Sequence, residues 1–185
     1  RTGNYPGVTV ARTLGTCRLP SGELQIEDLP GLYSLDPLSP DEQVVVDALG
    51  GTLPGQPRPD ALLVVLDGTS LSRSMGFLAD VLHLGLPVLV VLTMLDDLVA
   101  RGGDLDVAAF GRGIGVRALG VTGHRGGGID ALRAALDDGL TAGFDTWTAP
   151  AAPPPVRTEA TVEEWGAAVL AAARYEEGSR HQVTH

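Results

Sequence analysis

Lysine is absent from this sequence of 185 residues, and all 13 of its basic residues are arginine. The absence excludes lysine Schiff-base chemistry and any phosphate-binding loop that depends on a lysine ammonium group. Acidic residues number 23, which gives a net charge of −10 at pH 7. No basic stripe is therefore available to displace counterions from a nucleic-acid backbone, and we expect no nucleic acid among the partners.

Cysteine and long apolar runs are also scarce. The single cysteine, Cys17, excludes an internal disulfide and a thiolate metal cluster, and we expect it to be a small strand hydrophobe. The longest apolar run, 84–95, is broken by Gly85 and Pro87 and is too short to cross a bilayer. No signal peptide is recognisable and the first residue is not Met, so we expect a cytoplasmic fragment of a longer protein. An apolar fraction of 44% still suffices for a hydrophobic core.

The apolar pattern predicts five strands. Residues 61–66 and 88–92 are continuous apolar runs, which are typical of strands covered on both faces of a parallel sheet. Residues 8–14 and 23–27 alternate in the manner of half-buried strands, and 116–121 is a further strand. These strands are separated by segments with helical spacing, which predicts a doubly wound, mostly parallel α/β sheet. The predicted helices cover 39–49, 72–84, 96–113 with a break at two glycines, 129–140 and 158–177.

Three loops that follow predicted strands carry residues suited to a nucleotide. The first, Asp28 to Gly31, matches D-x-x-G. In that pattern the carboxylate can hold a Mg²⁺-bound water, and the small glycine lets its N–H approach a γ-phosphate. Alone the pattern is weak, because an Asp-x-Pro-Gly turn also forms for conformational reasons.

The other two loops are suited to a guanine base. In guanine-nucleotide-binding proteins the loop after the corresponding strand carries N-K-x-D, whose aspartate accepts both N–H groups of the guanine edge. Asp96 fits that role, while Thr93 departs from the asparagine, and the alternative is that Asp96 only caps the next helix. Thr122 and Gly123 follow the next strand, where a backbone N–H could meet the guanine carbonyl oxygen. The order of the three loops favours a nucleotide site.

Two longer segments resemble one family. Residues 3–10, GNYPGVTV, resemble the G-N-[WY]-P-G-V-T-V switch I of the ferrous iron transport protein B family of GTPases. Residues 28–35 followed by 39–42 resemble its switch II, D-L-P-G-x-Y-S-L followed by S-x-D-E. The similarity continues through 93–96, where the family has N-M-x-D, to 126–130. Together the two switch segments are far more specific than D-x-x-G alone.

The resemblance implies a P-loop-NTPase-like G domain that binds Mg²⁺ with GTP or GDP, together with a K⁺ ion. It also implies a membrane permease domain in the same full-length protein, and a location at the cytoplasmic face of the cell membrane. The residues implied are Thr9 and Asp28 for Mg²⁺, Gly31 for the γ-phosphate, Thr93, Asp96, Thr122 and Gly123 for the nucleotide, and the backbone of Gly3, Asn4 and Tyr5 for K⁺ and the phosphates.

The family's first strand, its G-x-x-x-x-G-K-[ST] loop and its first helix have no counterpart in this sequence. We therefore expect an N-terminally truncated G domain over 1–141, a Pro-rich extended linker over 142–157 and the start of a helical extension over 158–185. The sheet should lack the strand between 23–27 and 61–66. The favoured function is the GTP-binding domain that regulates Fe²⁺ uptake by GTP binding and hydrolysis. The alternatives are a degenerate, nucleotide-free G-like domain acting as an interaction or regulatory module, and an unrelated metabolite-binding domain.

Overall fold

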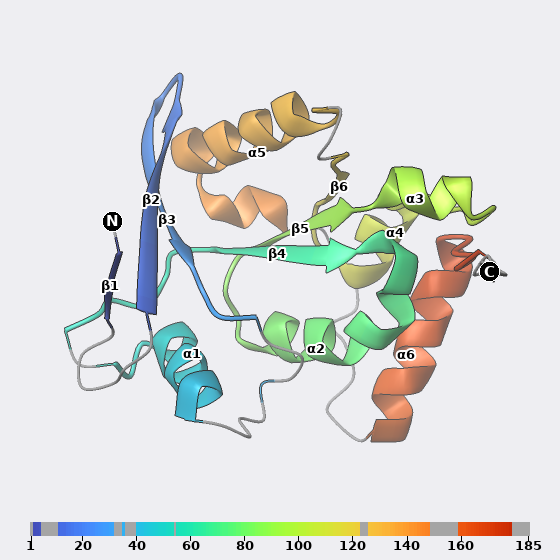
Figure 1. The fold of residues 1–185 in the computed structure, drawn as a ribbon, viewed down its shortest axis with the longest axis horizontal. Coiled ribbons are helices and arrows are strands. Elements are labelled where there is room, and N and C mark those ends of the chain that lie inside the picture. The colour runs from blue at the N-terminus through green and yellow to red at the C-terminus, as the bar shows by residue number, and fades with distance from the viewer. Residues whose placement is uncertain are drawn as a thin grey trace, which may run out of the picture.

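The computed structural model describes residues 2–4, 11–31, 35, 40–53, 55–122, 126–148 and 159–178. These residues form two separate three-stranded sheets flanked by helices (Figure 1). The first sheet is antiparallel, with β1 (Thr2–Asn4), β2 (Ala11–Leu19) and β3 (Gly22–Asp28) in that order. The second is parallel, with β4 (Leu62–Asp67), β5 (Val88–Thr93) and β6 (Ala118–Gly120) in that order.

Helices cover both faces of the parallel sheet, as the apolar runs predict. One face packs against α1 (Pro40–Gly50), α2 (Leu71–His83), α4 (Val107–Ile114) and α6 (Glu159–Ala172) in one large apolar cluster. The other face carries α5 (Ile129–Ala142), where Leu136 and Ala135 pack with Leu89 of β5 (Figure 1). Because both faces of β5 are covered, its first five residues are all buried. The short helices α3 (Leu95–Ala100) and η1 (Gly68–Ser70) follow β5 and β4 directly.

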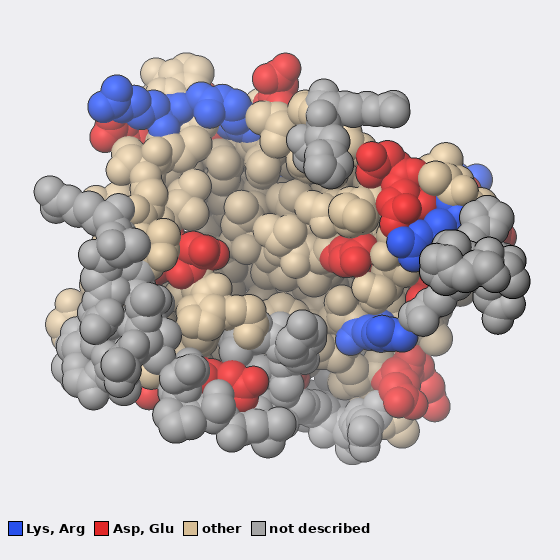
Figure 2. All heavy atoms as spheres, in the orientation of Figure 1, with Lys and Arg blue, Asp and Glu red and all other residues tan. Residues whose placement is uncertain are grey.

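The strand β4 is covered less completely than β5. Its burial alternates, with Leu62, Val64 and Leu66 inside and the next residues outside. Leu63 and Val65 are 38% and 59% exposed on the face opposite α2. The space-filling view in Figure 2 shows mostly uncharged atoms over the centre of the molecule, with a few isolated acidic side chains. Among the described residues this face of β4 is therefore covered less completely than the same face of β5.

The predicted gap in the sheet is confirmed for the described residues. β3 pairs with β2 and β4 pairs with β5, and no described strand lies between β3 and β4. The β2–β3 hairpin is held by α5 instead. Its turn residue Ser21 donates from both its backbone N and its Oγ to the carboxylate of Asp137, at 3.0 and 3.1 Å. Arg133 of the same helix donates to the carbonyl oxygen of Arg18 at 2.6 Å.

The start of the predicted linker has a structure that the composition did not indicate. Residues Phe144–Trp147 form a short 3₁₀ helix, η2, instead of an extended segment. Trp147 is 2% exposed, its Nε1 donates to the carbonyl oxygen of Ala135 at 3.0 Å, and its ring meets that of Phe144 edge-on. Burial of the Trp147 ring and its contact with the partly buried Phe144 outweigh the extended preference of the surrounding alanines and prolines. Residues 149–158 lie outside the described residues, so the division into domain, linker and extension stays a prediction.

The last helix ends earlier than its predicted limit at residue 177. α6 stops at Ala172, and Arg174 has a positive φ of 53°. Glu176 then forms a backbone bridge with Asp104, with N–H donation in both directions at 3.0 and 3.2 Å. These contacts hold the end of α6 against the connection between α3 and α4. Within the described ranges, every helix is too short or too polar to cross a membrane.

Candidate functional site

The ends of the three parallel strands bring several polar loops to one edge of the sheet. Asp67 at the end of β4 pairs in register with Thr93 at the end of β5, and Leu92 pairs with Gly120 at the end of β6. Because parallel strands end at the same edge, the loops after β4, β5 and β6 are neighbours. This edge is where ligands bind in open α/β sheets.

The loop after β5 presents Asp96 as the sequence predicts. Met94 is the N-cap of α3 in a left-handed conformation, with φ 58° and no capping hydrogen bond from its side chain. Asp96 lies in the first turn of α3, is exposed, and makes no hydrogen bond or ion pair with any residue that the structure describes. Its neighbour Asp97 is engaged by Arg101. Asp96 is therefore not the cap of α3, and its carboxylate is available to a ligand.

The hydroxyl of Thr93 is engaged within the fold and not directed to the side of Asp96 where a base would bind. Its Oγ1 donates to the carbonyl oxygen of Leu66, at 3.2 Å. The hydroxyl therefore ties the end of β5 to the end of β4. Thr122, after β6, is half-buried, and its backbone N–H donates to the carbonyl oxygen of Gly127 at 2.9 Å. Thr93, Asp96 and Thr122 thus lie at the ends of adjacent strands, as predicted.

The switch-like residues lie on the other sheet. Asp28 is the exposed last residue of β3, and Gly31 is exposed beyond it. No strand ladder joins Asp28 to the sheet that carries Asp96, so the predicted common edge stays a prediction. Gly3 and Asn4 lie in β1, where they pair with Arg12 and Ala11. Tyr5, Thr9 and Gly123 lie outside the described residues, so the roles expected of them are untested.

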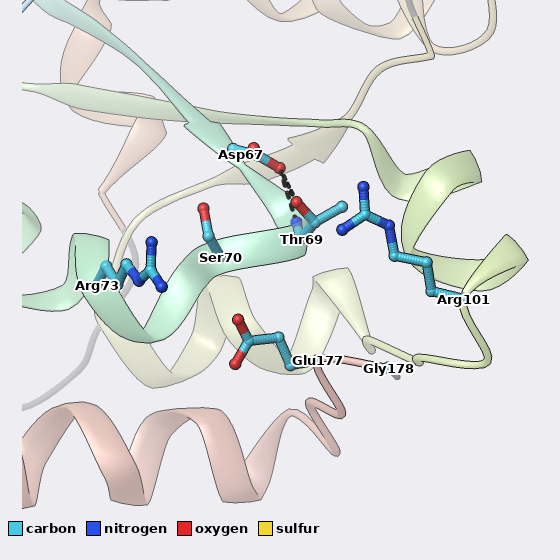
Figure 3. Close-up of a pocket in the computed structure, with 7 residues that line it drawn as sticks. All are labelled: Asp67, Thr69, Ser70, Arg73, Arg101, Glu177 and Gly178. Carbon is cyan, nitrogen blue, oxygen red and sulfur yellow. Dashed lines mark hydrogen bonds between the residues drawn. The ribbon is translucent and has the colours of Figure 1, made fainter. Parts of the chain in front are cut away.

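A polar pocket beside the Asp96 loop did not emerge from the sequence. Its volume is about 510 Å³, and it lies where the end of β4, the start of α2, the end of α3 and the segment after α6 meet (Figure 3). Asp67 at its rim accepts from the backbone N and the Oγ1 of Thr69, both at 2.8 Å. An aspartate directly after the continuous apolar run 61–66 is the signal that could have indicated it. Its lining residues are Asp67, Thr69, Ser70, Arg73, Arg101, Glu177 and Gly178.

The charges in this pocket balance, with two carboxylates facing two guanidinium groups. Tyr175, nearby, accepts a hydrogen bond on its Oη from the backbone N of Leu71 at 3.2 Å. Burial raises the pKa of Tyr175, the Leu71 N–H lowers it, and the negative charges of Glu177 and Asp67 raise it again, with a net upward shift. The phenol is therefore neutral at physiological pH and links the end of α6 to the start of α2.

The described residues contain no group of three or more His, Cys, Asp or Glu side chains that could hold a metal ion. The carboxylate of Asp28 is nevertheless the kind of oxygen donor that Mg²⁺ takes. The sequence offers fewer residues for binding a nucleotide phosphate. The printed sequence has no lysine and no G-x-x-x-x-G-K-[ST] motif to cradle a β-phosphate. The exposed carboxylates of Asp96 and Asp28 are of the chemical type that a guanine edge and Mg²⁺ take, whereas the sequence offers no lysine for a phosphate cradle.

Comparison with known proteins assigns the chain to a family. The family model of ferrous iron transport protein B matches residues 1–136. The chain belongs to this family. A relative, the Fe(2+) transporter FeoB of Leptospira biflexa, is 35% identical over 136 residues, which are 74% of this chain and 19% of that protein. The chain thus spans about a fifth of the length of the curated relatives it matches.

Solved structures of the family have the same fold. The cytosolic domain of L. pneumophila FeoB is 34% identical, with a TM-score of 0.65 over 74% of this chain and 56% of that one. A variant of the S. thermophilus N-terminal domain bound to GDP is 30% identical, with a TM-score of 0.70 over 85% of this chain and 56% of that one. The predicted fold class, an α/β G domain of the FeoB family, is confirmed.

Proposed function

We propose that this chain is the guanine-nucleotide-binding part of a ferrous iron transporter and regulates Fe²⁺ uptake through GTP binding and hydrolysis. The observation that carries the proposal is the free carboxylate of Asp96, at the first turn after a buried parallel strand. The GDP bound to the S. thermophilus relative supports the same ligand class. The relatives that match are Fe²⁺ transporters, which supports a permease domain in the same polypeptide and a place at the cytoplasmic face of the membrane.

The base would be selected by charge and hydrogen bonding. A carboxylate accepts, so Asp96 pairs with the two N–H groups on the guanine edge, and adenine offers no such pair. With adenine the carboxylate loses its water without a replacement, which is the arrangement that discriminates most strongly. Thr122 and Gly123 would border the base on the side of β6.

The other proposed roles concern Mg²⁺, the γ-phosphate and K⁺. Asp28 would hold Mg²⁺ through water and Thr9 through its hydroxyl, which are hard oxygen donors of the kind this ion prefers. Gly31 would donate its N–H to the γ-phosphate. The backbone carbonyls of Gly3, Asn4 and Tyr5 would shield the phosphates and bind K⁺.

The phosphate cradle must come from a strand, a glycine-rich loop and a helix that this sequence does not contain. The exposed Leu63 and Val65 and the gap between β3 and β4 support a place for such a segment. The alternative function, a nucleotide-free interaction module, is favoured by the absence of lysine and by the Thr93 hydroxyl, which is directed to Leu66.

Nucleotide titration separates these two functions. Fluorescent GDP and ADP are titrated with Mg²⁺ into the 185-residue chain, and into the chain joined to a strand–GxxxxGKS–helix segment before its first residue. We expect a guanine preference that is strongest in the joined protein and that falls about ten- to a hundredfold in Asp96→Asn. Asp97→Asn is the matched control, because that carboxylate is engaged by Arg101 in the same helix turn.

Equal affinity of the joined protein for the two nucleotides would refute the role of Asp96. Absence of any nucleotide binding in both proteins would favour the interaction module. An equal loss of preference in Asp96→Asn and Asp97→Asn would show that the charge of the helix turn matters, and not pairing with the base.

A further inference from the structure

Leu95, between Met94 and Asp96, has its side chain between two glycines. A Cβ atom added to Gly68 would lie 2.7 Å from Leu95 Cδ2, and one added to Gly120 would lie 2.6 Å from Leu95 Cδ1. Ordinary contacts of carbon atoms are about 3.5–4.0 Å. Each δ-methyl of Leu95 therefore occupies the space that a Cβ atom at one of those two positions would need, so a larger residue there would displace the Leu95 side chain.

The backbone conformation does not explain these glycines. Neither Gly68 nor Gly120 is among the glycines with positive φ, so other residues could adopt their dihedral angles. At both positions the atom nearest to an added Cβ is a δ-methyl of Leu95. At Gly68 there is a second close contact, because the added Cβ would also lie 2.9 Å from the carbonyl oxygen of Thr93.

The two glycines lie at the ends of the strands that flank β5. Gly68 follows β4 and Gly120 ends β6, so Leu95 bridges the ends of three adjacent strands. The loop is also held by the Thr93 hydroxyl and by the buried Leu98 of α3. α3 has six residues and its N-cap provides no side-chain hydrogen bond, so the helix depends on tertiary contacts for its direction.

We propose that Leu95, seated between Gly68 and Gly120, is a positioning residue that sets the direction of the Asp96 carboxylate and thereby the preference for guanine. The three residues are called the Leu95 clasp below. The proposal rests on the function proposed above. The clasp acts through the backbone, because Leu95 and Asp96 are consecutive residues in the first turn of α3 and turn together when the helix tilts.

Alanine substitutions in the clasp test this role. Gly120→Ala and Gly68→Ala should displace Leu95, raise amide hydrogen exchange over residues 95–98, and lower the GDP-over-ADP preference of the joined protein about tenfold. Leu95→Ala removes both δ-methyls and should also loosen the loop. The double variant Gly120→Ala with Leu95→Ala should be no worse than Leu95→Ala alone, since the new methyl enters vacated space.

Two other glycines serve as controls. Gly76→Ala adds a methyl in α2 that meets no atom within 4 Å, and should change neither readout. Gly166→Ala, in α6, creates a contact of 2.9 Å with Cβ of Met75, and should lower stability without altering exchange at 95–98 or the nucleotide preference.

The proposal is overturned if Gly120→Ala and Leu95→Ala both leave exchange at 95–98 and the preference unchanged, or if Gly166→Ala changes both as much. Additive losses in the double variant would also overturn it. If Gly120→Ala fails to fold, Leu95→Ala alone decides, because it adds no atoms. If the joined protein without any substitution binds neither GDP nor ADP, the proposed function fails. Amide hydrogen exchange over residues 95–98, in the single and double variants, then still tests whether Leu95 and the two glycines hold the loop.

Discussion

At the scale of single residues, several polar side chains at the ends of strands and helices are engaged by hydrogen bonds within the fold. Thr93 stands where the family has asparagine, and its hydroxyl bonds to the main chain of β4 instead of reaching towards the loop after β6. Asp67 closes its own turn on Thr69. Asp106 caps α4 by accepting from the backbone N of Ala109 at 2.9 Å. Asp96, in contrast, has no partner among the described residues, and this difference supports the ligand role proposed for it.

The Asp106 cap predicts an acid-sensitive contribution to stability. The N–H of Ala109 has the largest effect and lowers the pKa of Asp106 below its ordinary 3.8. Desolvation opposes it, and the positive charges of Arg174 and Arg112 lower the pKa further. A carboxyl group with a depressed folded-state pKa stabilises the fold above the unfolded value, and this is lost as the pH falls through the folded pKa. The contribution should therefore be complete at neutral pH and disappear below 3.8.

Urea unfolding at neutral and acid pH measures this effect. We expect Asp106→Ala to lower the unfolding midpoint at neutral pH and to weaken its fall in acid. Asp106→Asn keeps an acceptor for the helix N-terminus, so its neutral midpoint should lie between those of alanine and aspartate. Asp104→Asn, whose bridge to Glu176 uses backbone atoms only, is the control. Identical pH profiles for Asp106→Ala and the unchanged chain would contradict the prediction.

At the scale of elements, the β2–β3 hairpin depends on a helix that lies far from it in the sequence. Leu19 is buried in the apolar cluster that includes Leu136 of α5, and the turn is bonded to Asp137. No ladder joins the hairpin to the parallel sheet in the described residues, so these contacts hold the two sheets together. α5 therefore attaches the hairpin to the rest of the fold, which in a continuous sheet would be done by ladder hydrogen bonds.

Removal of the Asp137 carboxylate should loosen the hairpin. Asp137→Ala loses two hydrogen bonds at an exposed position, so we expect a loss of about 1 kcal/mol in the free energy of unfolding. Amide exchange should rise in β2 and β3 and stay unchanged in β5. Asp138→Ala is the matched control, since that carboxylate pairs with Arg117 and not with the hairpin. Equal exchange in both variants would show that the turn bonds do not hold the hairpin.

At the scale of the whole molecule, the gap between β3 and β4 leaves β4 with an apolar side towards solvent. Val65 is 59% exposed and Leu63 is 38% exposed, and the strand pairs on one edge only among the described residues. Exposed apolar strand edges pair with other chains unless they are charged or covered. We therefore expect the isolated chain to self-associate at this strand.

Sedimentation velocity and light scattering at increasing concentration test that expectation. Val65→Lys places a charge on the open side of β4 and should shift the chain towards monomer. Val99→Lys changes a valine that is 65% exposed on α3, away from the gap, and should leave association unchanged. A monomeric chain at all concentrations, or an equal effect of the two substitutions, would contradict the prediction.

The sequence alone determined the α/β fold class and the strands β4 and β5. It placed 8–14 and 23–27 in the same mostly parallel sheet, whereas the structure has β2 and β3 in a separate antiparallel sheet. Apolar runs such as that of β5 and the spacing of helix residues are local patterns, because they follow from which faces of an element must be buried. The switch-like segments and Asp96 were singled out because a ligand-binding loop needs particular residue types at a fixed spacing, and their roles stay predictions. The gap beside β4 followed from the family pattern.

Only the tertiary structure decided how these parts are held. The seating of Leu95 between Gly68 and Gly120, the attachment of the hairpin to Asp137 and the burial of Trp147 all join residues that are far apart in the sequence. The pocket between Asp67 and Glu177 has the same origin. Close approach and burial depend on distances across the fold, and no periodicity within one segment encodes them.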